Sequence, residues 1–217
     1  MKKHIICLGD SNTHGYCADP TDCADGGDRF NESERWTCLL QQLLGEDYHV
    51  LEEGLSGRTT VFPDPLHESM PTLDVAYPIL MSHEPVDLLI IMLGTNDTKE
   101  RLSANAPCIA RGMDRLLTKC KQVPCWGSHG PNILVICPPH IGEEMERSGV
   151  ADAMGSGCAA KSRELSRHME PMVKAQGCAW LDAEGLTEFN KIDYMHLTRK
   201  GHRLLAEHLA QLVPTLI

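Results

Sequence analysis

Short apolar runs alternate with amphipathic stretches along the chain, and this alternation constrains the fold more than any other feature of the sequence. Five runs have the length and composition of β-strands: residues 4–8, 49–52, 88–93, 133–137 and 178–181. Four of the five are nearly continuous in Ile, Val, Leu and Cys, which is typical of strands covered on both faces. We therefore expect a buried parallel sheet.

The stretches between and after these runs have helical periodicity: residues 36–44, 72–83, 106–122, 157–176 and 198–213. Thr198 is expected to cap the last of them, because a threonine hydroxyl can accept from a free N–H of the first turn. Strands that alternate with helices form parallel sheets with helices on both faces. The sequence predicts a three-layer α/β/α sandwich with a five-stranded, flavodoxin-like sheet, in one domain over residues 1–217.

Four segments lack either pattern and are expected to be irregular: residues 17–33, 57–70, 125–132 and 138–155. Three of them follow predicted strands. In open parallel sheets, ligands bind beyond the carboxyl ends of the strands. We therefore expect a site built from the loops that follow Leu8, Glu53, Leu93, Cys137 and Leu181.

The net charge of −10 argues against nucleic acid or an anionic membrane as a partner, because either would need a basic face. No stretch reaches the ~20 apolar residues of a membrane-spanning helix. The apolar run that begins at Ile5 ends at Leu8, which is too short for a secretory signal. A cytoplasmic location is therefore expected.

The ten cysteines are expected to be free thiols, because no secretory signal accompanies them. Cys120 and Cys125 form the tightest pair, and no second pair stands at zinc-finger spacing, so neither a structural metal nor another cofactor is expected. The sequence contains neither a Gly-x4-Gly-Lys-Ser/Thr phosphate loop nor a His-Glu-x-x-His motif. Their absence from the sequence argues against phosphate transfer and metal-dependent hydrolysis.

Ser11 follows the first predicted strand in a small polar turn, Gly9-Asp10-Ser11. This position places its hydroxyl at the carboxyl edge of the sheet, near a helix N-terminus where N–H groups favour a developing negative charge. A serine hydroxyl becomes an effective nucleophile when a base removes its proton. Taken alone, the segment fits a helix-capping serine more often than a nucleophile.

Two other turns at this edge carry groups that can stabilise an oxyanion. Asn96 follows the third strand, and its side-chain amide can donate a hydrogen bond without carrying charge. Gly54 and Gly57 follow the second strand, where glycine lets the backbone approach a ligand and donate its N–H. Taken separately, these residues are also common in ordinary turns.

Asp193 and His196 lie three residues apart in the turn before the last helix. At this spacing the carboxylate can accept from one imidazole nitrogen, which leaves the other nitrogen to accept a proton from a hydroxyl. Because the chain has eleven histidines, a capping aspartate beside a surface histidine is the competing interpretation. His202 is an alternative base at a poorer spacing from Asp193.

Together and in this order, the four segments resemble the blocks of the SGNH (GDSL-type) hydrolase superfamily. The resemblance extends from Gly9 to Gly201, and residues 35–37, 52–60 and 90–99 are similar to its arylesterase/acyltransferase branch. Asn12 stands where the GDSL name has Leu, which we expect to leave the catalytic roles unaffected. The matching blocks are Gly9-Asp10-Ser11, Gly57, Gly94-Thr95-Asn96-Asp97 and Asp193-x-x-His196.

The resemblance implies an SGNH hydrolase fold and a serine esterase or acyltransferase that acts on small carboxylic esters through an acyl-enzyme intermediate. It implies Ser11 as the nucleophile, His196 as the general base and Asp193 as the carboxylate that orients it. It also implies an oxyanion hole made by the N–H groups of Ser11 and Gly57 and the Asn96 amide. The arylesterase branch further implies a homo-oligomer.

Three more residues are predicted to contact the substrate or support the site. Tyr16 and Trp36 are candidates for pocket walls, since aromatic residues make up only 5% of the chain, although Trp36 also fits a core position. Asp10 is grouped with them and is expected to brace the nucleophile turn.

Other residues are expected to shape the site from outside. Asp97 is expected to orient the Asn96 loop. Arg58 is expected to clamp the same loop, with binding of a substrate carboxylate as the alternative. Residues 138–155 are expected to form a mobile wall over the acyl site. A solvated loop or an oligomer contact is an equally good interpretation of that segment.

Several functions remain open at this point. A carbohydrate acetylesterase or an acyl-CoA thioesterase would use the same chemistry, since substrate choice depends on the shape of the loops. A non-catalytic flavodoxin-like binding module is the alternative from a different class. That alternative requires a broken triad, whereas the sequence contains every expected member.

Overall fold

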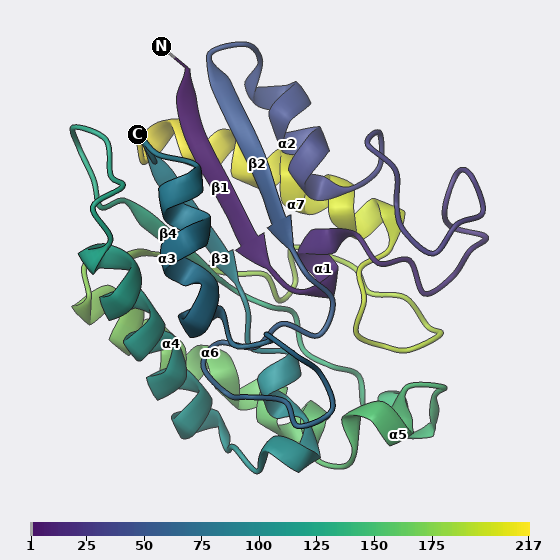
Figure 1. Cartoon of the computed structure of the whole chain (residues 1–217). Helices are drawn as coiled ribbons and strands as arrows, with labels where there is room; N and C mark the ends of the chain where they lie inside the picture. The colour runs from purple at the N-terminus through teal and green to yellow at the C-terminus, as the bar shows by residue number, and fades with distance from the viewer. Residues whose placement is uncertain (1) are drawn as a thin grey trace.

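The computed structural model describes residues 2–217, and its centre is a sheet of five parallel strands (Figure 1). The spatial order is β2-β1-β3-β4-β5, and each neighbouring pair is parallel. This arrangement confirms the predicted α/β/α sandwich. The strands are β1 (Lys3–Gly9), β2 (Tyr48–Gly54), β3 (Leu88–Met92), β4 (Ile133–Cys137) and β5 (Ala179–Asp182).

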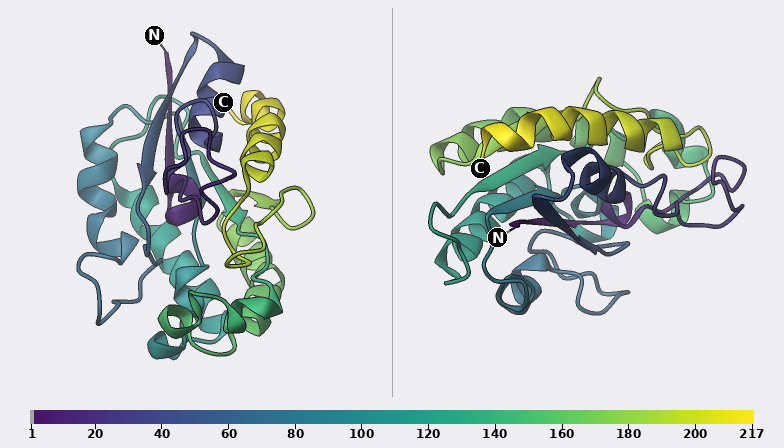
Figure 2. Two further views of the ribbon diagram at one scale, coloured as in Figure 1. Left: turned by 90° about the vertical axis from the view of Figure 1, so that its right-hand side faces the viewer. Right: turned by 90° about the horizontal axis from the view of Figure 1, so that it is seen from above.

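Helices cover both faces of the sheet, as Figure 2 shows with α3 on one side and α7 on the other. Helices α2 and α7 pack on one face, and α3, α4 and α6 pack on the opposite face. The helices are α1 (Ser11–His14), α2 (Trp36–Leu44), α3 (Thr72–Ser82), α4 (Ala106–Gln122), α5 (Ala151–Met154), α6 (Cys158–Ala175) and α7 (Arg199–Leu212). Short 3-10 helices span Asn96–Thr98, Glu100–Leu102, Glu143–Arg147 and Val213–Thr215.

Alternate side chains of the central strands enter two different hydrophobic cores. In β1, Ile6 packs toward α3, α4 and α6, whereas Ile5 packs toward α2 and α7. Successive side chains of a strand point to opposite faces, so a strand covered on both sides must be apolar throughout. Strands β3 and β4 are buried at every position, whereas the edge strand β2 is only partly buried and carries Glu52 and Glu53.

The predicted boundaries differ from the structure mostly by one or two residues. The last helix begins after Thr198, whose hydroxyl accepts from the Gly201 N–H at 3.0 Å, as the sequence predicted. Residues 138–155 were expected to be irregular but contain the Glu143–Arg147 3-10 helix and α5. Each is too short to give a periodic signal in the sequence.

The loops after all five strands meet at the carboxyl end of the sheet. Gly54 lets α1 pack directly against the end of β2, since a Cβ there would lie 2.2 Å from the His14 nitrogen. Helix α1 therefore starts at the sheet edge and carries Ser11 in its first position. No helix among the described residues has the length and apolar character needed to cross a membrane.

Candidate active site

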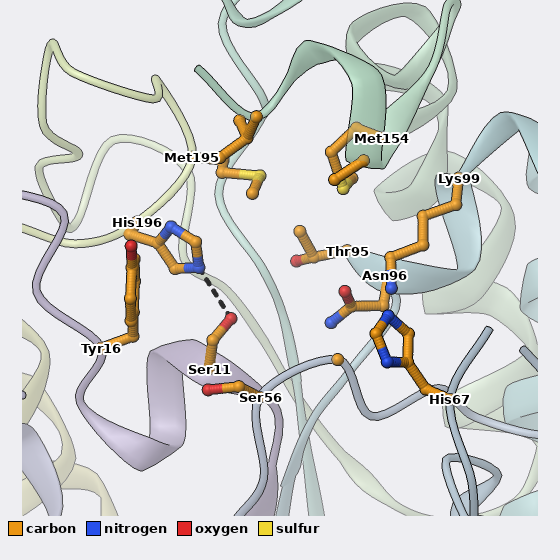
Figure 3. Close-up of a pocket in the computed structure, with 13 residues that line it drawn as sticks. Ser11, Tyr16, Ser56, His67, Thr95, Asn96, Lys99, Met154, Met195 and His196 are labelled. Carbon is orange, nitrogen blue, oxygen red and sulfur yellow. Dashed lines mark hydrogen bonds between the residues drawn. The ribbon is translucent and has the colours of Figure 1, made fainter. Parts of the chain in front are cut away.

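A pocket of about 260 Å³ opens where the loops after the five strands meet (Figure 3). One wall is mainly apolar, and the other carries polar and charged groups. Every strand contributes through the loop that follows it, as expected for an open parallel sheet. The lining residues are Ser11, Tyr16, Ser56, Gly57, His67, Thr95, Asn96, Lys99, Val150, Ala153, Met154, Met195 and His196.

Ser11, His196 and Asp193 form a continuous hydrogen-bonded chain at one side of this pocket. The Ser11 Oγ lies 2.8 Å from His196 Nε2, and His196 Nδ1 lies 2.6 Å from Asp193 Oδ2. Since a carboxylate accepts at Nδ1, that nitrogen carries the proton and Nε2 can accept from the Ser11 hydroxyl. All three residues are buried, with Ser11 7% exposed at the pocket floor.

The second oxygen of Asp193 holds the loop in shape. Asp193 Oδ1 accepts from the backbone N–H groups of Met195 and His196, both at 3.1 Å, and from Asn190 Nδ2 at 2.9 Å. Burial by itself would raise the pKa of Asp193, but these donors and the His196 side chain outweigh burial and hold the pKa below its usual value. Asp193 is therefore an ionised acceptor for the imidazole at neutral pH.

Asn190 and Tyr194 set the backbone path between Asp193 and His196. The Asn190 Oδ1 accepts from the N–H groups of Ile192 and Asp193, and its Nδ2 also donates to the His196 carbonyl. Tyr194 has a φ of 62°, an uncommon conformation for a residue with a side chain. This turn brings the aspartate and the histidine onto the same side of the loop.

Ser11, Gly57 and Asn96 line the same part of the pocket. Within residues 2–217, neither the Ser11 nor the Gly57 N–H donates to another protein group. Gly57 has a φ of 89°, which favours glycine at this position. The Asn96 amide lies at the same wall, and its Nδ2 is 3.4 Å from Asp10 Oδ2. An oxyanion hole requires uncharged donors of this kind.

The comparison with known protein families agrees with this geometry. The model of the GDSL-like Lipase/Acylhydrolase family matches residues 7–204, which include every residue of the hydrogen-bonded chain. The chain belongs to this family. No curated protein sequence matches the chain.

Solved structures of several esterases share the fold. An aryl esterase from M. smegmatis is 32% identical with a TM-score of 0.87, covering 99% of this chain and 100% of its own. A carbohydrate acetylesterase from Sinorhizobium meliloti is 31% identical with a TM-score of 0.88, covering 100% of both chains. A putative arylesterase from Agrobacterium tumefaciens is 26% identical with a TM-score of 0.85, covering 99% of this chain and 100% of its own.

These likenesses confirm the predicted resemblance to SGNH hydrolases and their arylesterase branch. As a GDSL-like acylhydrolase with esterases among its structural neighbours, the chain is a carboxylic ester hydrolase. The sheet order and the flanking helices are those of the SGNH hydrolase fold.

Asn12 has a role in this GDSL-like hydrolase that sequence reasoning missed. Its Nδ2 donates to the Met195 carbonyl at 3.2 Å, and its Oδ1 accepts from the Leu197 N–H at 2.9 Å. These two backbone groups lie on either side of His196. The side chain next to Ser11 therefore fastens the loop that carries His196, a contact that the sequence did not predict.

The structure separates the three residues predicted to contact substrate. Tyr16 lines the pocket, and its ring lies edge-on to the His196 ring with the centroids 4.6 Å apart. Trp36 is instead fully buried in the core between the sheet and α7, where its Nε1 donates to the Asn12 carbonyl at 3.1 Å. Asp10 is 1% exposed and lies behind Asn96, so it supports the nucleophile turn and does not line the pocket.

His202, the alternative base, is fully buried and accepts from the Trp36 N–H through Nδ1 at 3.2 Å. Burial lowers the pKa of His202 to about 3. Arg58 does not clamp the Asn96 loop as expected. It donates instead to the carbonyls of Gly9 and Glu53, so it ties together the ends of β1 and β2.

The segment 138–155 contributes Val150, Ala153 and Met154 to the pocket wall. Met154 packs in a small hydrophobic cluster with Met195, which connects this wall to the loop of the base. The apolar side of the pocket therefore comes from residues that follow β4 and β5.

Asp97 fastens the Asn96 loop to the loop after β2. The Thr60 N–H donates to both Asp97 oxygens, at 3.0 and 3.2 Å, and the Thr60 hydroxyl also donates to Oδ1. The Asp97 side chain is fully buried, and this burial raises its pKa from 3.8 to about 6 against the Thr60 hydrogen bonds. The structure thus places Asp97 where the sequence predicted a loop-orienting residue.

We expect Asp97→Asn to gain stability relative to the wild type as the pH rises from 4 to 7. Between pH 3.8 and about 6, native Asp97 holds a proton that the unfolded chain has lost. The free energy of unfolding of the wild type therefore falls as the pH rises through this range, whereas asparagine does not titrate. At ~1.4 kcal/mol per pH unit, the relative gain is about 3 kcal/mol. Urea unfolding of both proteins across this range measures it, and a constant difference would contradict the expectation.

Proposed function

We propose that this chain is a serine esterase that cleaves small carboxylic esters through an acyl-enzyme on Ser11. The observation that carries the proposal is the chain of hydrogen bonds from Ser11 Oγ through His196 to Asp193, at 2.8 and 2.6 Å. In a serine hydrolase, an imidazole takes the proton from the serine hydroxyl, and a carboxylate orients the imidazole. The three groups stand in that order here. We further propose that residues 1–217 act as one domain.

In the first step, the Ser11 oxygen attacks the ester carbonyl while its proton passes to His196 Nε2. The carbonyl oxygen becomes an oxyanion, which the N–H groups of Ser11 and Gly57 and the Asn96 amide stabilise. Asp193 stabilises the imidazolium through Nδ1. His196 then gives the proton to the leaving alcohol as the carbon–oxygen bond breaks, and the acyl group stays on Ser11.

In the second step, water attacks the acyl-serine in the same way. His196 takes a proton from the water and returns it to the Ser11 oxygen, and the carboxylic acid leaves. Another alcohol in place of water would give transesterification by the same path.

The direct test is covalent labelling by an organophosphonate probe, followed by mass spectrometry of the labelled peptide. We expect one phosphonyl group per chain, on Ser11, together with loss of hydrolysis of 4-nitrophenyl acetate. Absence of labelling in a folded protein would favour the non-catalytic binding module and refute the proposal. A label on another serine would place the nucleophile elsewhere.

Aryl esters and acetylated carbohydrates are the two substrate classes proposed for this pocket. The support is structural likeness to an aryl esterase at 32% identity and to a carbohydrate acetylesterase at 31% identity, each over nearly the whole chain. A panel of aryl acetates, acetylated sugars and acyl-CoA compares these classes and the thioesterase alternative by kcat/KM.

We propose a cytoplasmic location and self-association as well. The location is supported by ten cysteines that are all free thiols, most of them buried, as expected in a reducing compartment. Self-association is supported by the likeness to the arylesterase branch. Fractionation of the source cells and light scattering of the purified protein test these two proposals.

A further inference from the structure

Lys99 places a cation in the pocket wall that lies across from His196. Figure 3 shows His196 and Tyr16 on one side of Ser11, and Asn96, Lys99 and His67 on the other. The Lys99 side chain is only 6% exposed, yet it lines the pocket. A Cβ built on Gly57 would lie 4.0 Å from Lys99 Nζ, so the ammonium group lies close to a proposed oxyanion donor.

The partner of Lys99 is a carboxylate that another cation already neutralises. Asp64 is fully buried, and Arg101 binds both of its oxygens, with Nε to Oδ1 at 2.9 Å and Nη2 to Oδ2 at 2.7 Å. The Leu66 N–H also donates to Oδ1, at 3.0 Å. The Arg101 hydrogen bonds, more than any other group, hold the pKa of Asp64 well below its usual value.

Lys99 is therefore the second cation on one carboxylate. Its Nζ donates to Asp64 Oδ2 at 3.1 Å, and within residues 2–217 this is its one side-chain acceptor. An ammonium group has three N–H donors, so two remain for a group in the pocket. The cluster of Lys99, Arg101 and Asp64 carries a net charge of +1. Asp10 is a further buried acid whose pKa the Lys99 charge acts to lower, but among the described residues Lys99 Nζ donates only to Asp64. A largely buried excess charge is costly unless an opposite charge pairs with it.

The geometry of ester cleavage decides which part of a substrate reaches Lys99. The leaving alcohol must lie beside His196, because that residue protonates it. The oxyanion points toward Gly57 and Asn96. The acyl chain then extends away from His196, either along the apolar wall of Val150 and Met154 or toward the wall that carries Lys99, and only the second wall offers a charge to its end.

We propose that the pocket selects esters whose short acyl chain ends in an anionic oxygen group, and that Lys99 binds this group. Monoesters of short dicarboxylic acids are the simplest members of this class. The inference deepens the proposed esterase function and rests on it. Lys99 thus acts as a specificity-determining residue for the acyl part of the substrate.

The experiment compares kcat/KM for monomethyl succinate, glutarate and adipate with that for methyl valerate, by pH-stat titration at pH 8. All four share one leaving group, so only the acyl part differs, and monomethyl glutarate matches methyl valerate in chain length. In the wild type we expect the best monoanion to exceed methyl valerate by about 10-fold or more. Lys99→Met should lower the monoanion value by about 10- to 100-fold, as expected for loss of a hydrogen bond between charged groups, and methyl valerate by less than about threefold.

Lys161→Met is the matched control, because Lys161 Nζ donates to the Thr98 carbonyl at 2.8 Å beside the same segment but does not line the pocket. It should leave the monoanion preference unchanged. Equal losses for charged and neutral esters in Lys99→Met would show a general role near the oxyanion and overturn the inference. So would a wild-type preference for methyl valerate.

Two further measurements keep the inference testable if Lys99→Met does not fold or no ester is cleaved. Lys99→Arg keeps the cation and should keep the preference. In calorimetry with Ser11→Ala, monomethyl glutarate should bind more tightly than the neutral ester methyl valerate, and the difference should shrink at high salt. Equal binding of the two compounds would overturn the inference. If the protein bound the anion selectively but cleaved no ester and was not labelled at Ser11, only the proposed esterase function would be overturned.

The last arm tests the alcohol side with acetoxyacetate against ethyl acetate. Here the carboxylate belongs to the leaving group, which should lie near His196 and away from Lys99. If the wild type prefers acetoxyacetate to ethyl acetate at all, we expect Lys99→Met to keep that preference unchanged. A Lys99-dependent preference would place the anion on the alcohol and overturn the assignment to the acyl chain.

Discussion

Ser11→Ala is expected to lower kcat for 4-nitrophenyl acetate by at least about 10⁴-fold. The substitution removes the oxygen that forms the acyl-enzyme and leaves only substrate binding and the oxyanion donors, which in serine hydrolases retain a small fraction of the rate. Burst-phase kinetics measure the effect directly, because the stoichiometric first turnover of the wild type should vanish in the variant.

Stability and a second serine provide the controls for Ser11→Ala. The unfolding temperature should change little, because among the described residues the Ser11 hydroxyl makes a single hydrogen bond, which is to His196. Ser82→Ala is the matched variant, because Ser82 lies at the exposed end of α3 and, within the part of the chain that the structure describes, its hydroxyl donates only to the Pro78 carbonyl. Retention of more than about 1% of the activity by folded Ser11→Ala would show that another nucleophile carries the reaction.

Asp193→Asn is expected to lower kcat by about 10³- to 10⁴-fold with little change in KM. Asparagine can present an N–H to His196 Nδ1, which favours the tautomer with the proton on Nε2, where it cannot accept from Ser11. The KM should stay close to the wild-type value because Asp193 is buried behind His196 and does not line the pocket.

The pattern of the kinetic constants separates orientation of the base from general damage to the loop. Asp182→Asn is the control, since Asp182 ends β5 and its Oδ1 accepts from the Glu184 N–H at 3.0 Å, outside the pocket. It should retain nearly full activity. If the loss in Asp193→Asn appeared mainly in KM, or disappeared when unfolding was corrected for, Asp193 would be a structural residue of the loop.

Lys99 and Asp193 affect different kinetic quantities, which allows the two proposals to be judged separately. Loss of Asp193 should slow the cleavage of every ester alike, because the base is shared. Loss of Lys99 should change only the ratio between charged and neutral acyl chains. A variant that changes both would indicate movement of the whole pocket.

Some of the site could be predicted because neighbouring residues in the sequence suffice to specify it. Asp193 and His196 are three residues apart, so one turn can join them, and Asn190 a few positions earlier completes that turn. Ser11 and Asn96 each follow a strong apolar run, and parallel strands end at one edge. The contacts of Asn12 were missed, and the choice between pocket and core for Trp36 stayed open, because each depends on segments far away in the chain.

The sequence by itself determined the order of strands and helices, the sheet edge at which the polar turns gather, and the residue types of the nucleophile, base and orienting acid. The first two follow from periodicity and spacing, which are local properties of the chain, whereas the roles expected of Ser11, His196 and Asp193 follow from the resemblance to SGNH hydrolases. Only the tertiary structure decided that Asn12 fastens the loop around His196, that Trp36 belongs to the core, and that Lys99 shares Asp64 with Arg101. Such contacts join residues from 24 to 185 positions apart, and their geometry depends on how the packed helices set the loops against one another.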